Sequence, residues 1–406
     1  MNEAANKPQV EAGWYGADPI NMDLKSNPHP RYRQLREQAP VNLTPDGHWR
    51  LTRYVDIQKL LKHSKVGMRH LNGLIPDHNR EETEASKFML RQDPPDHDRL
   101  RQLVSKAFTP RALATLRPQV ENLTHTELDK IIATGEMDLV EHLALLVPAA
   151  SMCAMLGISF EDRSYLSGLV SHATYLLAIA SYPELAETAM KALEELAAYM
   201  MELIEQRRVN PGNDILTALV QAEEAGDKLS TEELLQQCIG LLIAGLETTI
   251  GLIGNGMRCF GNNPDQFERL AAQPELIGTA VEECLRYEPS VPQTVRVLWE
   301  DTQFGDVLIP ADSVINVMLI AANRDPQVFT EPDRFDIGRN EARHCSFGGG
   351  IHFCLGSHLA RMNAEVAFTA IAQRITNIEL IDAGFEWAPS LFRIPGRIPA
   401  RFQIRR

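Results

Sequence analysis

The chain has 406 residues, of which 44% are hydrophobic and 23% are charged. This is the balance of an ordinary globular protein, and the length allows a sizeable buried core. The 54 acidic residues outnumber the 40 basic ones and give a formal net charge of −14. Because non-specific nucleic-acid binding needs a basic surface, this charge argues against a nucleic-acid partner.

Six cysteines are scattered along the chain without a C-x-x-C pair: Cys153, Cys238, Cys259, Cys284, Cys345 and Cys354. Their spacing predicts neither a disulfide framework nor a zinc ribbon and favours reduced thiols in the cytoplasm. Residues 1–15 lack a basic segment followed by an apolar run, so no signal peptide is expected. The uncharged apolar stretch at 234–246 is shorter than the roughly 18 residues of a membrane span, so no membrane anchor is expected.

No internal repeat or Gly/Ser-rich linker divides the sequence. We therefore expect a single domain over residues 1–406, mainly helical with small β-sheets. Residues 41–54 alternate around a Pro-Asp-Gly turn, which predicts a hairpin in a β-rich part at about 40–55. Helical periodicity dominates a core at about 93–290, and a strand-rich stretch at 294–317 lies in the remaining region at about 290–406.

Four of the predicted helices carry functional motifs. Asp93, followed by two prolines, predicts the N-terminus of the first, which ends at Pro110. Ser230 and Glu233 form a capping box for a second helix, which runs to about residue 260 and spans roughly 45 Å. A third helix is expected at about 275–287, and a fourth at about 355–375, directly after Cys354.

The strongest chemical signal is the glycine-rich segment 347–356, which contains Cys354. Its glycines let the backbone approach another group closely. The cysteine stands at the start of a helix, where free amide groups and the helix dipole stabilise a thiolate, either as a metal ligand or as a nucleophile. A buried structural cysteine is the simpler interpretation. A phosphate-binding loop is disfavoured because no Gly-Lys-Ser/Thr follows.

Three further groups of polar residues accompany this loop. Glu283 and Arg286 lie three residues apart and can pair on one helix face, as can His97 and Arg101 at four residues apart. The segment 244–249, Ala-Gly-Leu-Glu-Thr-Thr, places an ionisable residue inside an apolar helix, which is costly unless the residue has a function. Taken alone, each group has a simpler interpretation. Glu283 and Arg286 could be a surface ion pair, His97 and Arg101 a polar helix face, and the segment 244–249 a helix turn that touches water.

With these segments in this order, the chain resembles the cytochrome P450 family, and its soluble bacterial class more than the membrane-anchored one. The pattern Phe-x-x-Gly-x-His-x-Cys-x-Gly is matched by Phe347, Gly350, His352, Cys354 and Gly356. The resemblance extends from about residue 93 to the C-terminus. It implies the family's triangular helical fold, with a long central helix across a haem b group (iron protoporphyrin IX).

By this resemblance, Cys354 is the axial ligand of the haem iron and the metal-binding residue. The other residues implied to contact the haem are His97, Arg101, Arg296, His352, Phe347, Gly356, Ala244 and Gly245. Among them, the histidines and arginines would bind the two propionates, because charge-assisted hydrogen bonds hold carboxylates well.

The resemblance also implies a catalytic pair on the long helix. Small residues at Ala244 and Gly245 would leave room for dioxygen beside the iron. The Thr248 hydroxyl and the Glu247 carboxylate would deliver protons to the bound oxygen. The reaction implied is insertion of one oxygen atom from O2 into a C–H or C=C bond of a substrate.

Supporting residues follow from the same resemblance. Glu283 and Arg286 are expected to pair with Arg334 and to support the haem loop. The substrate pocket is expected to be apolar, with a lining that includes Leu241, Ala244, Val291, Thr294, Leu391 and Phe392. One departure from the family is Asn363, where Glu is common, which puts a local salt bridge in doubt.

No flavin or iron–sulfur segment fits in this length, so the resemblance implies a separate ferredoxin-type electron donor with its reductase. Candidates for a basic docking patch are Arg101, Lys106, Arg343 and Arg361. A different function within the same fold is a haem-thiolate enzyme that uses peroxide or rearranges its substrate. Two further classes are a zinc protein built on the His and Cys residues at 344–358, and a helical interaction protein without a cofactor.

Overall fold

The structure is a computed structural model, and it describes residues 26–45, 47–71, 87–105, 108–178, 183–224, 229–341, 343–390 and 392–405. Its α-helices are α2 (His29–Gln38), α3 (Tyr54–Leu61), α4 (Asp96–Ser105), α5 (Pro110–Ile131), α6 (Leu146–Leu156), α7 (Arg163–Ala173), α8 (Ala186–Val209), α9 (Ile215–Glu224), α10 (Thr231–Asn262), α11 (Pro264–Ala272), α12 (Ile277–Tyr287), α13 (Leu319–Ala322) and α14 (Ser357–Ala372). Its strands are β1 (Val41–Leu43), β2 (Trp49–Leu51), β3 (Val66–Gly67), β4 (Glu136–Asp138), β5 (Thr294–Leu298), β6 (Thr302–Phe304), β7 (Val307–Ile309), β8 (Val314–Val317), β9 (Ile375–Leu380), β10 (Glu386–Trp387), β11 (Pro395–Arg397) and β12 (Pro399–Ile404). Helices dominate, as predicted.

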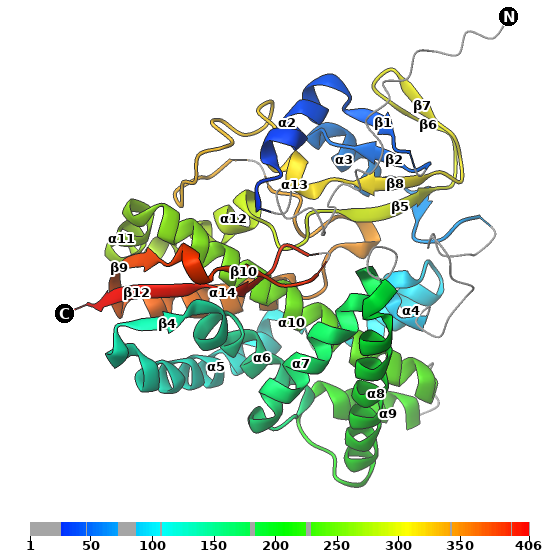
Figure 1. Ribbon diagram of the computed structural model, residues 1–406. Coiled ribbons are helices and arrows are strands. Elements are labelled where there is room, and N and C mark those ends of the chain that lie inside the picture. Colours follow the sequence, from blue (N-terminus) through cyan, green and yellow to red (C-terminus); the bar gives the residue numbers. More distant parts are fainter. Residues whose placement is uncertain are drawn as a thin grey trace, which may run out of the picture.

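The predicted hairpin is present and opens a five-stranded sheet of order β1-β2-β8-β5-β3. Val41 of β1 lies opposite Leu51 of β2 in an antiparallel pair, and β2 then pairs parallel with β8. One face of this sheet packs on α3, where Ile57 and Leu60 join Leu51 and Ile315 in a buried cluster. In Figure 1 the sheet lies with α2, α3 and α13 in the upper part of the molecule, and α5 to α9 occupy the lower part.

The long helix α10 is the centre of the main hydrophobic core. Its capping box is confirmed: the Ser230 hydroxyl accepts from the Glu233 amide, and the Glu233 carboxylate accepts from the Ser230 amide. It contacts α6, α7, α8, α12 and α14. Among the described residues, it is the one helix long and apolar enough to cross a membrane, yet 78% of its apolar window is buried in the fold. Here it serves as a core helix.

Both ends of the first predicted helix differ from expectation. Asp93 does not cap α4, which begins at Asp96. Its carboxylate instead accepts hydrogen bonds from the backbone amides of Met68 and Arg69, at 2.9 to 3.1 Å. Pro110 begins α5, with Thr109 as its N-cap, rather than ending α4. The Asp93 carboxylate could have capped the helix, but it binds a segment more than 20 residues earlier in the chain. Local spacing does not reveal a contact of this kind.

Candidate active site

The cysteine loop, residues 347–356, contains a short 3-10 turn, Gly350–His352, and directly precedes α14. The Cys354 amide donates to the Phe347 carbonyl at 2.9 Å, which closes the loop on itself. Gly348 and Gly350 have φ of +67° and +66°, a left-handed conformation that favours glycine. A Cβ on Gly350 would also collide with the carbonyl oxygen of Leu61, at the end of α3. The glycines therefore shape this loop and seat it on α3.

Cys354 is the least buried cysteine of this chain and is half-buried. All six cysteines are free thiols, and the other five are buried. Burial raises the pKa of the Cys354 thiol, while the Gly356 amide, Arg101 and Arg361 lower it in part. A thiolate here is therefore favoured by an additional positive charge, which a bound metal ion supplies. The residue fits the metal ligand that the sequence predicted.

Donors for an anionic ligand converge next to this loop from distant parts of the chain. The rings of His97, on α4, and His352, in the loop, lie 4.4 Å apart. The Nε2 atom of His352 is buried without a hydrogen-bond partner, 3.8 Å from the Asp93 carboxylate. Burial, together with the nearby charges of Arg296 and His97, lowers the pKa of His352, although Asp93 opposes this. An added carboxylate would satisfy this orphaned nitrogen.

Arg296, on β5, is a second buried donor of the same group. Its guanidinium Nη1 donates to neutral acceptors: the Met68 sulfur, the Thr294 hydroxyl and the Val295 carbonyl. Burial lowers the pKa of Arg296 to about 10, although the Asp93 carboxylate opposes this. A buried cation whose hydrogen bonds go to neutral acceptors is costly. Its surroundings therefore fit the carboxylates of a haem group.

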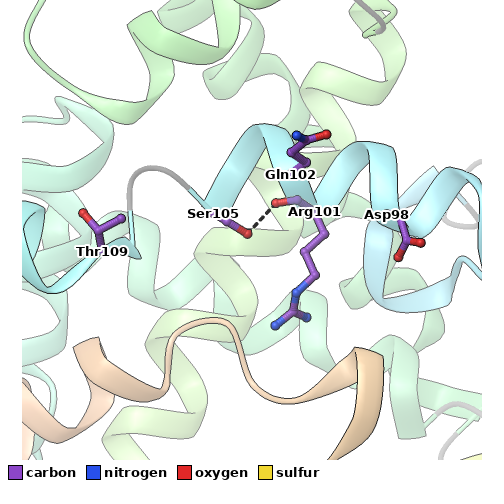
Figure 2. A pocket seen from close by; sticks show the side chains of 5 residues that line it. All are labelled: Asp98, Arg101, Gln102, Ser105 and Thr109. Carbon is purple, nitrogen blue, oxygen red and sulfur yellow. Dashed lines mark hydrogen bonds between the residues drawn. The ribbon is translucent and has the colours of Figure 1, made fainter.

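Arg101 contacts the backbone of the cysteine loop. Its Nη2 atom donates to the Phe353 carbonyl at 2.6 Å, directly before Cys354. Figure 2 shows its side chain extending from α4 toward the loop below. Asp98, Arg101, Gln102, Ser105 and Thr109 line an open cleft of about 490 Å³ on this face. Arg101 thus joins α4 to the cysteine loop at the edge of the cleft.

The middle of α10 presents a small exposed patch in an otherwise buried helix. The Thr248 hydroxyl donates to the Ala244 carbonyl at 2.7 Å, one turn earlier. Ala244 is exposed and Thr248 half-buried, whereas Glu247 is 4% exposed. Gly245 does not share this patch: a Cβ there would lie 2.7 Å from the Met152 sulfur of α6. It allows α6 to approach α10 closely, which is a different place from the one expected beside Ala244.

Glu283 and Arg286 form a buried ion pair on α12, with contacts of 2.7 and 2.8 Å. Arg286 also donates to the carbonyls of Asn323, Pro332 and Arg334, so its donors are fully used. The Asn323 side chain in turn accepts from the Cys345 amide at 2.7 Å, at the entrance to the cysteine loop. The pair supports this loop through Asn323, a residue that sequence reasoning missed because no local pattern marks it.

The third charge of this group is Arg339, and the expectation of Arg334 was wrong. Arg339 Nε lies 3.2 Å from the Glu283 carboxylate. The Arg334 side chain is 61% exposed and pairs with Glu331, while only its backbone carbonyl reaches Arg286. Both arginines follow the same proline-rich turn, so spacing could not separate them.

The predicted pocket residues lie at different depths. Leu241 is buried, whereas Val291, Thr294 and Phe392 are half-buried. The Arg393 amide donates to the Ser290 carbonyl, which brings the segments around Phe392 and Val291 together. Leu391, like Lys106 of the predicted docking patch, lies outside the described residues.

Asn363, where the family often has Glu, has a partner of its own. It is fully buried on α14, and its side-chain oxygen accepts from the Ser151 hydroxyl of α6 at 2.5 Å. A neutral hydrogen bond between helices therefore stands at this position. The zinc hypothesis loses its basis, because the described residues contain no group of three or more His, Cys, Asp or Glu side chains that could hold a metal ion.

A helical fold with a half-buried cysteine before a core helix, beside buried donors for carboxylates, is the architecture of haem-thiolate proteins. The sequence model described as Cytochrome P450 matches residues 41–275 and 271–377. Vitamin D(3) 25-hydroxylase of Pseudonocardia autotrophica is 39% identical, over 84% of each chain. Cytochrome P450 107B1 of Saccharopolyspora erythraea is 38% identical, over 87% of this chain and 88% of the relative. The crystal structure of P450BioI in complex with an acyl carrier protein ligated to hexadec-9Z-enoic acid superimposes with a TM-score of 0.85 at 35% identity, over 94% of this chain and 99% of that one.

The chain belongs to the cytochrome P450 family. It is therefore a monooxygenase that uses haem b.

The exchange of roles between Arg334 and Arg339 can be tested by unfolding. Replacing Arg339 with Met leaves part of the buried Glu283 charge uncompensated, so we expect a loss of about 3 kcal/mol in unfolding free energy. Arg334→Met is the matched control, and it should stay within about 0.5 kcal/mol of the parent. Denaturant titration measures both, and equal losses would contradict the assignment.

Proposed function

We propose that this enzyme inserts one oxygen atom from O2 into a C–H or C=C bond of a hydrophobic small molecule, with electrons from a separate ferredoxin-type protein and its reductase. The observation that carries the proposal is the convergence of His97, Arg296 and His352 beside the half-buried thiol of Cys354. We further propose that it works in the cytoplasm, since its six cysteines are free thiols.

Bound haem supplies redox chemistry with dioxygen, and a thiolate ligand donates electron density that favours O–O cleavage. In this proposal the Cys354 sulfur would hold the haem iron. Arg296 and the two histidines, His97 and His352, hold the propionates. Phe347 and Gly356 shape the loop around the sulfur, through the Phe347 carbonyl and the Gly356 amide.

Thr248 and Glu247 are proposed to move protons. The Thr248 hydroxyl is held by the Ala244 carbonyl and can donate to a ligand only by rotating away from it. Glu247 is the neighbouring residue and is buried. Burial and the Glu247 carboxylate raise the pKa of Tyr175, which places this phenol near the acid. The acid and the hydroxyl are neighbours in sequence, and the proposal requires a proton to pass between them.

The substrate is proposed to be hydrophobic, because the residues proposed to line the pocket, Leu241, Val291 and Phe392, have apolar side chains. The named relatives agree with this class: one is called a vitamin D(3) hydroxylase, and another is bound to an acyl chain on a carrier protein. These names differ in chemistry, so they support an apolar molecule rather than one compound.

The electron donor is proposed to dock on the face that carries the cleft of Figure 2. Ile351 and Phe353 of the cysteine loop are exposed at 45% and 42%, and Arg343 is exposed nearby in sequence. Arg361 is less available for docking because its guanidinium pairs with Glu282. Arg101 likewise is held by the Phe353 carbonyl.

The cysteine ligand is tested by visible spectroscopy. Reduced protein under carbon monoxide should show the red-displaced Soret band of a thiolate-ligated haem. A Cys354→Ala variant should lose the band. Cys345→Ala, a buried thiol nine residues earlier, is the control and should keep it. A band that survives in Cys354→Ala would overturn the proposal.

The proton relay is tested by the coupling of oxygen use to product. Thr248→Ala removes the hydroxyl, so product formed per O2 consumed should fall by up to about 10²-fold, the lower end of what proton transfer contributes. Thr249→Ala, a buried neighbour, is the control and should couple like the parent. Both ratios come from an oxygen electrode and product quantification. An unchanged ratio in Thr248→Ala would remove this residue from the relay.

The electron source is tested by comparing two sets of conditions with the same substrate. Reduced ferredoxin with O2 should support turnover that hydrogen peroxide alone does not match, because Glu247 and Thr248 are both present. Faster turnover with peroxide alone would favour a peroxide-driven enzyme.

A further inference from the structure

Glu282, on α12, stands next to the buried pair of Glu283 but faces α14. Its carboxylate accepts from Arg361 Nε at 2.6 Å and Nη2 at 3.0 Å, a bidentate contact that fixes the plane of the guanidinium. His344 Nε2 lies 3.3 Å from the same carboxylate. Burial acts to raise the pKa of Glu282, but His344 and Arg361 lower it to about 2. The carboxylate is therefore charged at neutral pH.

The fixed guanidinium lies over an aromatic ring of the cysteine loop. Its carbon Cζ is 4.5 Å from the centroid of the Phe347 ring, which is a cation–π contact. The His344 ring lies 5.5 Å from the same ring. Since the Phe347 carbonyl accepts from the Cys354 amide at 2.9 Å, Arg361 packs on the residue that holds Cys354 in place.

Arg361 also brings a positive charge to the cysteine loop. Its guanidinium lies over the ring of Phe347, whose carbonyl accepts from the Cys354 amide. A flexible surface arginine would spend much of its time in solvent, where water screens its charge. The bidentate contact with Glu282 opposes this, because it holds the Arg361 side chain, which is 28% exposed, in one orientation. The position of this charge beside the loop thus depends on a carboxylate that lies on another helix.

We propose that Glu282 and Arg361 are positioning residues that set the reduction potential of the haem. Glu282 holds the guanidinium of Arg361 over Phe347, and the held cation favours the reduced, more negative state of the haem iron with its thiolate ligand. This inference rests on the proposed ligation of haem iron by Cys354.

The direction in which Glu282→Gln changes the midpoint potential distinguishes a positioning role from a direct effect of its charge. If the side chains stayed in place, Glu282→Gln would remove a negative charge and raise the midpoint potential. If Glu282 acts by holding Arg361, the same substitution frees the cation to move into solvent, and the potential falls. We expect it to fall in the parent chain and not to fall in an Arg361→Met background, where no cation is left to hold.

The measurement is redox titration of the bound haem, which requires no turnover. Glu365→Gln is the matched control, because Glu365 of α14 pairs with Arg117 of α5, and no aromatic ring of the described residues lies under that arginine. It should not lower the potential. If Arg361→Met does not retain haem, Arg361→Gln replaces it as the background, since glutamine also carries no charge.

Three results would overturn the proposal: a potential in Glu282→Gln that rises or stays unchanged, an equal fall in the Arg361 background, or an equal fall in Glu365→Gln. Failure of the ligation itself would be visible separately. The carbon monoxide Soret band would then be absent from the parent chain before any substitution is made.

Discussion

The buried guanidinium of Arg286 is the constraint on which the rest of the site depends. A guanidinium carries five N–H donors and cannot be neutralised, so burying it requires an acceptor for each of them. Here Glu283 supplies two contacts, and three backbone carbonyls at 323, 332 and 334 supply the others. The segments at 323 and at 332–334 must therefore both lie against Arg286 before the chain reaches the cysteine loop. The Asn323 side chain then accepts from the Cys345 amide and so fixes the start of that loop.

The charge of the molecule is distributed unevenly between its surface and its site. The chain as a whole carries a formal charge of −14. Beside the cysteine loop, Arg296 donates to neutral acceptors and His352 keeps an unsatisfied nitrogen, with Asp93 as the nearby carboxylate. Burial of this kind costs stability unless further acceptors complete it. The fold thus keeps a local requirement for carboxylates that the overall composition conceals.

Local patterns in the sequence predicted the local features of the structure. The capping box of Ser230 and Glu233, the hairpin of β1 and β2, and the pairing of Glu283 with Arg286 each depend on residues a few positions apart. The family resemblance added the order of the motifs and the fold. These features could be predicted because helix and hairpin geometry fixes which near neighbours meet.

The features that spacing did not reveal all depend on contacts between distant segments. Asp93 binds the amides of Met68 and Arg69 instead of its own helix, and Arg339 takes the place expected of Arg334. Gly245 faces α6 because Met152 packs there. In each case two residues or faces were equally suitable by local rules, and the tertiary packing selected one of them. Asn323 had no local pattern at all.

The close approach of Gly350 to α3 connects the cysteine loop to the N-terminal sheet on which α3 packs. Because the Leu61 carbonyl lies in the space that a side chain at 350 would occupy, a movement of α3 toward the loop would meet the backbone at Gly350, four residues before Cys354. Grafting the sheet of a homologue onto this chain would therefore have to transfer its α3 together with its cysteine loop. The two are far apart in sequence, but they can be exchanged only as a unit.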